Sequence, residues 1–302
     1  MDFVQQAGQY RQAAEAAIQE LFTPDGLVPD SGIPETLREP LRYAFLTGGK
    51  RLRPVLCMAA CQAVSGVFEP ALPAALAIEA LHTYTLIHDD LPCMDDDLLR
   101  RGQPTVHAKY GFAQGVLAGD ALQAVAFELA LRSPVAPAAV CALARELAAA
   151  AGPTGVIGGQ WVDVTARPPH DEARVAYVHE HKTADLIRCA LAMGGIAGGA
   201  DDAQLAALRR YGLNLGIAFQ IVDDLLDADD PAKKDEMGIL QVVGADEAKR
   251  RAGALTSEAL AALDVLASGD ASRDEAVSLL RHLAEDQIKR TSAVRGRRTR
   301  RG

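Results

Sequence analysis

Apolar residues recur at helical spacing along almost the whole chain, and no sustained stretch alternates apolar and polar residues as a half-buried strand would. The pattern predicts helices at about residues 2–21, 35–47, 51–65, 72–90, 112–132, 136–150, 153–165, 171–198, 202–228, 246–267 and 272–291. Gly, Pro and Asp residues mark the connections, as in TPDG at 23–26 and RPPHDE at 167–172. The chain is therefore expected to be all-α.

The domain organisation predicted from this pattern is simple. The chain has no tandem repeat and no linker of low complexity, so residues 1–292 are expected to form one helical domain. Five arginines fall in the last eight residues, and we expect residues 293–302 to form a basic, disordered tail.

Composition agrees with helix-on-helix packing and restricts the partners. The 302 residues are 49% hydrophobic but only 5% aromatic, with alanine and leucine dominant. The net charge is −9 in spite of the basic C-terminus, which argues against nucleic-acid binding by the body of the protein. An anionic substrate would therefore need local basic pockets or bound cations.

Cysteine usage and the N-terminal sequence favour a reducing, cytoplasmic compartment. The five cysteines are odd in number and form no C-x-x-C pair, so neither a disulfide framework nor a zinc site is indicated. The segment MDFVQQAGQYRQAAEAA lacks the regions of a signal peptide, and no run of eighteen uncharged apolar residues occurs. We therefore expect no membrane span.

Two clusters of aspartates carry the strongest chemical signal. LIHDDLPCMDDD at 86–97 holds five aspartates within nine positions, and Pro92 should end or distort the preceding helix. FQIVDDLLD at 219–227 places Asp223 and Asp227 four residues apart on one helix face. Like charges at this spacing weaken a helix, and a hard divalent cation shared with substrate phosphates would offset that cost.

Each cluster alone could also be a solvated acidic helix end. Both clusters follow apolar runs that should be buried, however, which favours a pair of magnesium sites. An EF-hand loop that begins at Asp227 is excluded, because its sixth position is not Gly and its twelfth is not Glu.

Several separate basic positions could bind anions. They are Lys50, Arg51 and Arg53 in GGKRLRP (48–54), His82, Arg100 with Arg101, and Lys182 in HKT (181–183). Lysine offers phosphate a point charge, and arginine offers it a bidentate fork. Taken singly, each could be an ordinary surface charge or a core histidine. Together with two acidic clusters, they indicate two diphosphate groups, one held through metals and one held directly.

These motifs resemble those of short-chain trans-isoprenyl diphosphate synthases of the bacterial farnesyl diphosphate or geranylgeranyl diphosphate type, in the polyprenyl synthetase family. The matching stretches keep the family's order over about residues 40–230. They are GGKRLRP (48–54), HTYTLIHDDLPCMDDDLLRRGQPTVHAKYG (82–111), LAGDAL (117–122), GGQWVD (158–163), HKTADLI (181–187) and FQIVDDLLD (219–227). The two aspartate motifs with the intervening LLRRGQPT are highly specific.

The resemblance implies the isoprenoid synthase fold, a single-domain helical bundle around a deep central cavity, usually as a homodimer. It implies a magnesium-dependent transfer in which dimethylallyl or geranyl diphosphate is joined to isopentenyl diphosphate. By position, it assigns Asp89, Asp95, Asp223 and Asp227 to magnesium, Arg100 to the allylic diphosphate, Lys50, Arg53, His82 and Arg101 to isopentenyl diphosphate, and Lys182, Thr183 and Gln220 to the reacting end.

The chemistry of such a transfer suits these residue types. The allylic cation needs negative dipoles and no water around it. The Thr183 hydroxyl, the Gln220 amide oxygen and the Lys182 carbonyl could supply the dipoles. The carbonyl could do so only if its helix is distorted, which the sequence does not reveal. The released diphosphate is the expected base, and Cys93 is interpreted as a small filler.

Tyr84 bears on the length of the product. In the resembling family, residues just before the first acidic motif line the floor of the chain pocket, and Tyr84 lies five residues before Asp89. A tyrosine there should stop growth early, and with the Pro92-Cys93 insertion this resembles farnesyl (C15) synthases. The alternatives are that Tyr84 is an ordinary core residue and that the product is geranylgeranyl diphosphate (C20).

One segment departs from the family, and two other classes of protein compete. The residues ADDPAKKDEMGILQVVG (228–244) form a shorter loop with Gly238-Ile239 where Gly-Lys is expected, and Lys233 or Lys234 could replace the missing cation. A terpene cyclase needs only one diphosphate site, which fits the full DDLLD and GGKRLRP motifs poorly. A non-catalytic partner subunit tends to lose an aspartate motif, whereas both are kept here.

Overall fold

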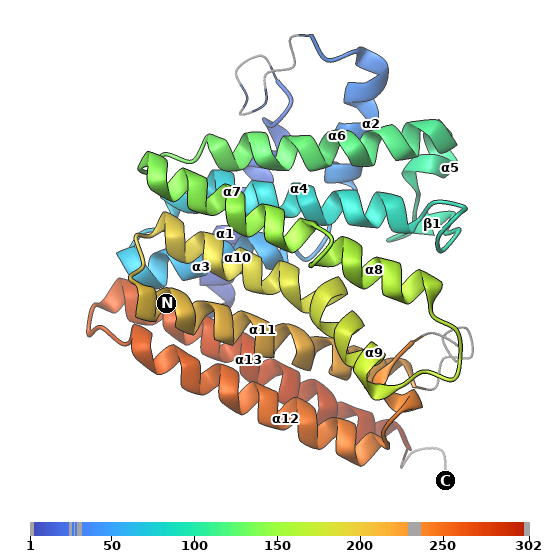
Figure 1. Ribbon diagram of the computed structural model, residues 1–302. Helices are drawn as coiled ribbons and strands as arrows, with labels where there is room; N and C mark the ends of the chain where they lie inside the picture. The colour runs from blue at the N-terminus through green and yellow to red at the C-terminus, as the bar shows by residue number, and fades with distance from the viewer. Residues whose placement is uncertain (1–2, 24–25, 27, 29–31, 229–236, 299–302) are drawn as a thin grey trace.

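The all-helical pattern is confirmed in the computed structural model of the chain (Figure 1). The structure describes residues 3–23, 26, 28, 32–228 and 237–298. Its α-helices are α1 (Phe3–Gln19), α2 (Glu35–Leu46), α3 (Leu52–Ser65), α4 (Leu72–Asp89), α5 (Val106–Tyr110), α6 (Phe112–Leu131), α7 (Pro137–Ala151), α8 (Val156–Thr165), α9 (Glu172–Val178), α10 (Asp185–Ala197), α11 (Asp202–Asp227), α12 (Ala245–Ala262) and α13 (Ala271–Arg298). The same described residues also contain short turns of other helix types: η1 (Glu69–Ala71), η2 (His179–Ala184), η4 (Ile239–Gln241) and η5 (Leu263–Leu266).

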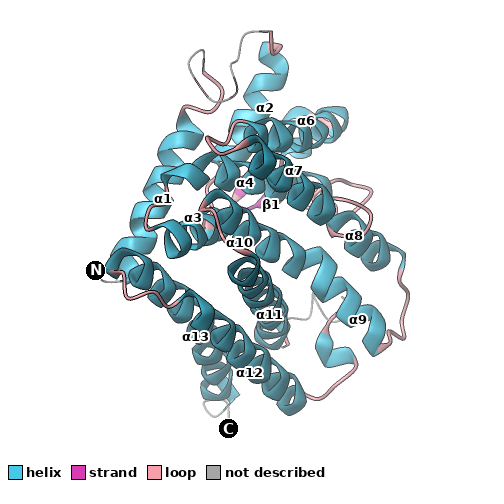
Figure 2. Ribbon diagram, turned by 60° about the vertical axis from the view of Figure 1, so that its left-hand side comes forward, coloured by secondary structure: helices cyan, strands magenta, loops and turns pink. Residues whose placement is uncertain are grey.

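Strands are nearly absent from these described ranges. β1 (Leu99–Arg100) and β2 (Gln103–Pro104) form one antiparallel pair, in which Leu99 lies opposite Pro104. Figure 2 shows this pair in magenta among the cyan helices. The sequence pattern did not predict the pair, because two residues per strand are too few to establish an alternation.

Two helices in the middle of the bundle are apolar on nearly all sides. Every residue from Pro54 to Val64 of α3 is buried, and so is most of α4. α6 packs against α4, and α10 packs against both α3 and α11, so that the long helices lie side by side (Figure 1). A helix that is hydrophobic all round is typical of a bundle interior. The packing therefore fixes the C-terminal end of α4, where the first acidic motif begins.

The predicted helix at 171–198 is divided in the structure. α9 ends at Val178, a π-helical turn (η2) follows, and α10 begins at Asp185. A π turn widens the helix by one residue over a short span, which changes the hydrophobic period too little to be seen in the sequence. The structure thus supplies the distortion near Lys182 that the sequence does not reveal.

The C-terminal helix is longer than predicted. α13 continues to Arg298, past the expected helix end at residue 291 and past the boundary placed after residue 292. Residues 293–298, which belong to the segment expected to be a disordered tail, are part of this helix, and no proline interrupts them. The last four residues of the predicted tail, 299–302, lie outside the described residues.

One stretch is long and apolar enough, by composition, to be considered as a membrane span. It covers Pro137–Thr165. In the structure a turn at 152–155 divides this stretch into α7 with 15 residues and α8 with 10 residues. Each helix is shorter than the roughly 20 residues that a span needs. The apolar stretch is therefore formed by two separate helices of the bundle, α7 and α8.

Candidate active site

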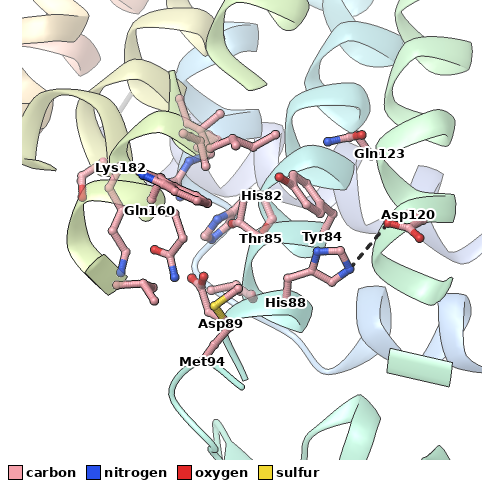
Figure 3. Close-up of a pocket in the computed structure, with 18 of the residues that line it drawn as sticks. His82, Tyr84, Thr85, His88, Asp89, Met94, Asp120, Gln123, Gln160 and Lys182 are labelled. Carbon is pink, nitrogen blue, oxygen red and sulfur yellow. Dashed lines mark hydrogen bonds and ion pairs between the residues drawn. The ribbon is translucent and has the colours of Figure 1, made fainter. Parts of the chain in front are cut away.

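A cavity of about 590 Å³ lies between α4, α6, α8 and η2 (Figure 3). Its volume is within the roughly 300–1,000 Å³ of typical ligand pockets. The predicted site residues that line it are Arg53, His82, Tyr84, Asp89, Lys182 and Thr183. Apolar side chains from α8 and α10, such as Val156, Ile157 and Leu186, form much of the remaining wall. Segments far apart in the sequence thus meet at one cavity, as the motifs predicted.

A second cavity of about 420 Å³ shares Lys182 and Thr183 with the first. Asp95, Asp163 and Gln220 also line it. Lys182 and Thr183 therefore stand where the mainly apolar cavity meets a polar one, which is the arrangement needed by a substrate with a hydrocarbon chain and a charged head.

The first acidic motif begins where α4 ends. The chain turns back after Asp89, whose carbonyl oxygen accepts a hydrogen bond from the Asp95 backbone N at 2.9 Å. The pKa of the Asp89 carboxyl is raised to about 6, mainly by burial, with Lys182 opposing the rise and Asp95 adding to it. Burial also raises the pKa of Asp95. A cation bound at these two neighbouring carboxyls would favour their charged forms. The pair is therefore suited to bind one.

Asp90 and Arg100 form a structural pair next to this motif. Asp90 is 3% exposed, and its Oδ1 accepts a hydrogen bond from Arg100 Nε at 2.6 Å. The hairpin β1–β2 carries Arg100 back to the end of α4, so the predicted ligand of the allylic diphosphate is held beside the acidic motif. Asp90 is therefore occupied with holding Arg100, whereas Asp89 faces the main cavity.

Arg53 and His82 line the main cavity and form a basic cluster with Arg101. Arg53 Nε is buried and has no hydrogen-bond partner among the described residues. Burial lowers the pKa of Arg53 to about 10, and burial together with Arg53 and Arg101 lowers the pKa of His82 well below its usual value. The cluster is short of negative partners, which suits it to an anion. Lys50, predicted for the same group, is exposed and lines neither cavity.

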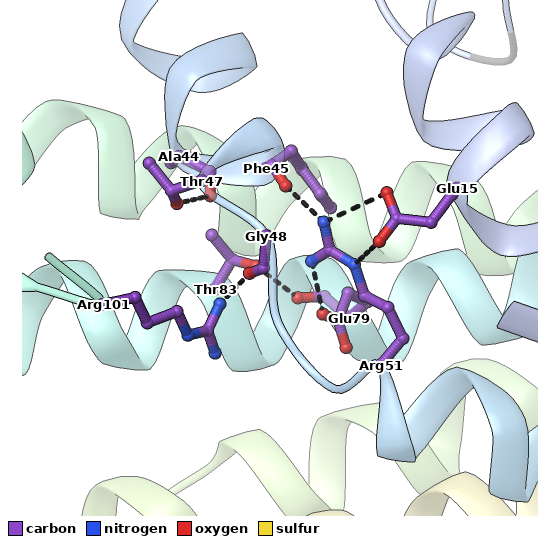
Figure 4. A network of polar contacts seen from close by, with 9 residues as sticks. All are labelled: Glu15, Ala44, Phe45, Thr47, Gly48, Arg51, Glu79, Thr83 and Arg101. Atoms are coloured by element: carbon purple, nitrogen blue, oxygen red, sulfur yellow. Dashed lines mark hydrogen bonds and ion pairs between the residues drawn. The ribbon is translucent and has the colours of Figure 1, made fainter. Parts of the chain in front are cut away.

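Arg51 does not belong with these anion-binding groups. It is 3% exposed, and its side chain pairs with Glu79 at 2.8 Å and Glu15 at 2.7 Å (Figure 4). A third hydrogen bond joins its Nη2 to the Phe45 carbonyl at 2.6 Å. The backbone at Arg51 is left-handed, with φ of 49°, and the side chain is buried between exposed Lys50 and half-buried Leu52. Its role is therefore structural.

The aspartates of the second acidic motif, on α11, have different hydrogen-bond partners. Asp224 accepts hydrogen bonds from Gln220 Nε2 at 2.9 Å and from the Ile239 backbone N at 2.7 Å. Asp223 accepts one from Arg290 Nη2 of α13 at 2.6 Å. Burial raises the pKa of Asp223, Arg290 lowers it, and Asp227 raises it again. Asp223 and Asp227 are thus close to each other, as predicted, but neither lines the two cavities.

The loop after this motif can be followed only at its end. Residues 229–236, which include Lys233 and Lys234, lie outside the described residues. Gly238 and Ile239 lie against Asp224, so the position at which a lysine was expected here supports the second motif through a backbone hydrogen bond.

A chain of hydrogen bonds links Asp224 of this motif to Thr183, one of the residues that the resemblance assigned to the reacting end of the substrates. The Asp224 carboxylate fixes the Gln220 amide, whose oxygen accepts a hydrogen bond from Thr183 Oγ1 at 2.9 Å. The Gln220 oxygen thus accepts the Thr183 hydroxyl with one lone pair and orients that hydroxyl. Because the hydroxyl hydrogen points toward Gln220, lone pairs of the Thr183 oxygen remain available to the cavity.

The π turn η2 is packed directly on α8. A Cβ placed at Gly159 would lie 2.4 Å from the Lys182 backbone N, so only glycine allows this approach. Lys182 Nζ then reaches Asp163 Oδ2 at 2.5 Å. Burial alone would lower the pKa of Lys182, but Asp163 and Asp89 raise it, so that the ammonium stays charged between the acidic groups.

Two functional candidates were missed from the sequence. Arg290 had no signal beyond being one basic residue late in a helix. Gln160 lies within the quoted GGQWVD motif, so the motif could have indicated it. Both amide atoms of Gln160 are buried without a hydrogen-bond partner in the described part of the chain, and the side chain lines the main cavity (Figure 3). An unpartnered buried amide is destabilising, which points to a functional reason for it.

Replacing Gln160 by Met should therefore lower activity without lowering stability. The variant keeps the volume and removes an unsatisfied amide, so we expect the free energy of unfolding to stay within about 0.5 kcal/mol of the parent or to rise. We expect kcat to fall about 10- to 100-fold, measured by steady-state kinetics beside urea unfolding. Gln62→Met is the matched control, because the Gln62 amide bonds Tyr10 and Ser272, and its loss should cost about 1–3 kcal/mol. Full activity of Gln160→Met would show that the amide has no role.

The donor set fits magnesium bound together with a substrate. Among the described residues no cluster of three or more His, Cys, Asp or Glu side chains could hold a metal by itself. Magnesium, however, commonly takes one or two carboxylates and completes its coordination with phosphate oxygens and water. Asp89 with Asp95, and Asp223 with Asp227, offer such pairs of carboxylates.

Residues 34–286 match the family profile described as polyprenyl synthetase. The chain belongs to the polyprenyl synthetase family. Among family members, geranylgeranyl pyrophosphate synthase 11, chloroplastic, from Arabidopsis thaliana is 43% identical over 262 residues, which cover 84% of this chain and 70% of that protein. Geranylgeranyl pyrophosphate synthase 7, chloroplastic, from the same plant is 49% identical over 200 residues. That match covers 64% of this chain and 57% of the relative, so the chain spans little more than half the relative's length.

Solved structures of similar proteins have the same fold. An FPP/GFPP synthase from Zymomonas mobilis is 37% identical, with a TM-score of 0.81 over 93% of this chain and 99% of that chain. A geranyltransferase from Helicobacter pylori, complexed with magnesium and isoprenyl diphosphate, is 32% identical, with a TM-score of 0.78 over 94% and 98%. The predicted isoprenoid synthase fold is therefore confirmed.

Proposed function

We propose that this member of the polyprenyl synthetase family is a prenyl transferase that joins an allylic diphosphate to isopentenyl diphosphate. The observation that carries the proposal is that Asp89, Lys182 and Thr183 together line one mainly apolar cavity, of which Figure 3 labels Asp89 and Lys182. The separate basic cluster around Arg53 and His82 supports a second diphosphate site, which a terpene cyclase would not need.

The charged groups would divide the two diphosphates between them. Asp89 and Asp95 would hold magnesium at the first motif, and Asp223 with Asp227 at the second. When bound, magnesium neutralises the leaving diphosphate and so favours cleavage of the allylic C–O bond. Arg100, held by Asp90, and Lys182, held by Asp163, would add fixed positive charge on the same diphosphate.

The walls of the cavity would then protect and stabilise the cation. The lone pairs of Thr183, whose hydroxyl is oriented by Gln220, would face the positive carbon, and the distorted turn η2 would offer carbonyl dipoles. Apolar side chains of α8 and α10 would exclude water.

Isopentenyl diphosphate would be held by Arg53, His82 and Arg101, with Lys50 nearby in sequence. Its double bond would form the new C–C bond with the allylic carbon. Loss of a proton, with the released diphosphate as the base, would restore a double bond and complete the transfer.

We propose farnesyl diphosphate as the product, because Tyr84 stands across the cavity. The tyrosine is 6% exposed, and in Figure 3 it lies between the end with Asp89 and Lys182 and the end with Gln123. Geranylgeranyl diphosphate is the second candidate, because the Arabidopsis relatives carry that name. Their names do not decide the length made here, since a single side chain at the floor can change it.

A product assay tests both parts of the proposal. Purified protein is given magnesium, labelled isopentenyl diphosphate and, in parallel, dimethylallyl, geranyl or farnesyl diphosphate, and the chain length is read by chromatography. We expect a dominant C15 product from the two shorter starters, and Tyr84→Ala should shift it to C20 or longer. A C20 product from the parent protein would contradict the farnesyl assignment. Absence of any condensation would favour a partner subunit that needs a second chain.

We also propose that the protein works as a cytoplasmic homodimer, as expected from the family. Phe112, Leu117 and Leu131 on α6 support a protein contact there, because these large apolar side chains are between 52% and 60% exposed.

A further inference from the structure

Trp161, the single tryptophan of the sequence, is a largely uncovered part of the wall of the main cavity. It lies on α8 and is 71% exposed, although it lines the cavity. Ile157 and Val164, about one turn to either side, also line the cavity and are 43% and 41% exposed. This spacing places the three apolar side chains on one face of α8. A continuous apolar surface at a cavity marks a place where an apolar ligand is expected to bind.

Two contacts with Lys182 fix the turn of α8 that carries Trp161. A Cβ at Gly159, two residues before Trp161, would lie 2.4 Å from the Lys182 backbone N, so the two segments touch there. Asp163, two residues after Trp161, accepts a hydrogen bond from Lys182 Nζ at 2.5 Å. Each contact is thus within about 3 Å of Trp161 along the helix axis. Gln160, the preceding residue, points into the same cavity (Figure 3). The indole therefore lies at the reacting end of the cavity.

We infer that the indole of Trp161 covers the first isoprene unit of the allylic diphosphate and keeps water from the reacting carbon. This inference rests on the proposed function. Cleavage of the C–O bond leaves an allylic cation, which either forms a C–C bond with isopentenyl diphosphate or forms a C–O bond with water. The second route releases a proton and wastes the substrate as an allylic alcohol. An indole over the cation excludes water from that side and attracts the positive carbon through its π electrons.

The first test measures the fate of the cation. The protein is given magnesium, isopentenyl diphosphate and labelled geranyl diphosphate, and chromatography gives the ratio of C10 alcohols to condensed product. Trp161→Ala should raise this ratio about two- to thirtyfold, the factor that a contact between a cation and an aromatic ring supplies. Trp161→Phe keeps a ring and should recover most of the parental ratio. Val162→Ala is the matched control, because Val162 is on the same helix but lines neither cavity, and it should keep the parental ratio.

The second test uses the fluorescence of Trp161, which is the sole tryptophan signal of the chain. Geranyl diphosphate with magnesium, in the absence of isopentenyl diphosphate, should shift the emission to shorter wavelength, whereas inorganic diphosphate with magnesium should not, because it has no hydrocarbon.

The outcomes separate this inference from the proposed function. If the parent protein condenses its substrates but geranyl diphosphate leaves the emission unchanged, or if Trp161→Ala keeps the parental ratio, the inference is wrong and the proposed function stands. If the free protein already emits like a buried tryptophan, a second copy of the chain covers Trp161, and the inference is again wrong. If the parent protein condenses no starter, the proposed function fails and the inference fails with it.

Discussion

Replacing Asp89 by Asn should remove nearly all product formation while making the protein more stable at neutral pH. The carboxylate is expected to bind magnesium, and loss of one preorganised electrostatic group commonly lowers kcat about 10²- to 10³-fold. Steady-state kinetics with labelled isopentenyl diphosphate measures this loss. Asp223→Asn should have an effect of similar size, although it also breaks the hydrogen bond from Arg290.

The gain in stability follows from the pKa of Asp89. Burial raises this pKa to about 6 from 3.8, so the folded protein resists ionisation more than the unfolded chain does. The resulting penalty is absent below the unfolded pKa, grows as the pH rises through this window and is complete above about 6. We expect Asp89→Asn to raise the free energy of unfolding by about 1–3 kcal/mol at pH 7.5, with the gain shrinking toward pH 4. Urea unfolding at several pH values measures it.

Asp96→Asn makes the same chemical change at an exposed position of the same loop. Asp96 has φ of 54°, which asparagine tolerates well. It should keep most of the activity and change the free energy of unfolding by less than about 0.5 kcal/mol, because the side chain is exposed. If Asp89→Asn kept more than a tenth of the parental kcat, or if Asp96→Asn lost as much, the assignment of Asp89 to the first magnesium site would be wrong.

The helices were predictable where buried apolar residues recur at helical spacing along the chain. α4, α6 and α11 begin and end within one residue of their predicted bounds, because their apolar faces and flanking Gly, Pro and Asp residues are both written in the sequence. The π turn η2 was not predictable. It depends on Gly159 of another helix, and its effect on the hydrophobic period is smaller than the variation between side chains.

The candidate site was likewise predictable only where the signal is local in the sequence. Motif residues such as Asp89 and Lys182 were found because charge is rare beside buried apolar runs. Their partners were not found, since Asp163 lies 19 residues before Lys182 and Arg290 lies 67 residues after Asp223. Such pairs depend on how helices pack. A sequence can therefore indicate which groups do chemistry before it indicates what holds them.

Arg51 is the clearest example of a residue whose role depends on packing. It lies in sequence between Lys50 and Arg53, two predicted substrate ligands, but its side chain has a structural role. Its guanidinium joins Glu15 of α1, the Phe45 carbonyl at the end of α2 and Glu79 of α4 (Figure 4). Glu79 is also only 3% exposed. Neighbouring Gly48 accepts a hydrogen bond from Arg101. The network thus fixes the turn that presents the basic cluster.

Replacing Arg51 by Met should destabilise the protein by about 3–5 kcal/mol, because it leaves the buried carboxylate of Glu79 without its partner. The double variant Arg51→Met/Glu79→Met should recover much of this loss, since two apolar side chains then replace a buried ion pair. Urea unfolding measures both. Arg132→Ala is the control, because its pair with Glu128 is exposed on both sides and should be worth less than about 0.5 kcal/mol. If Arg51→Met cost no more than this control, or if the double variant were less stable than the single one, the network would not be the support of the turn.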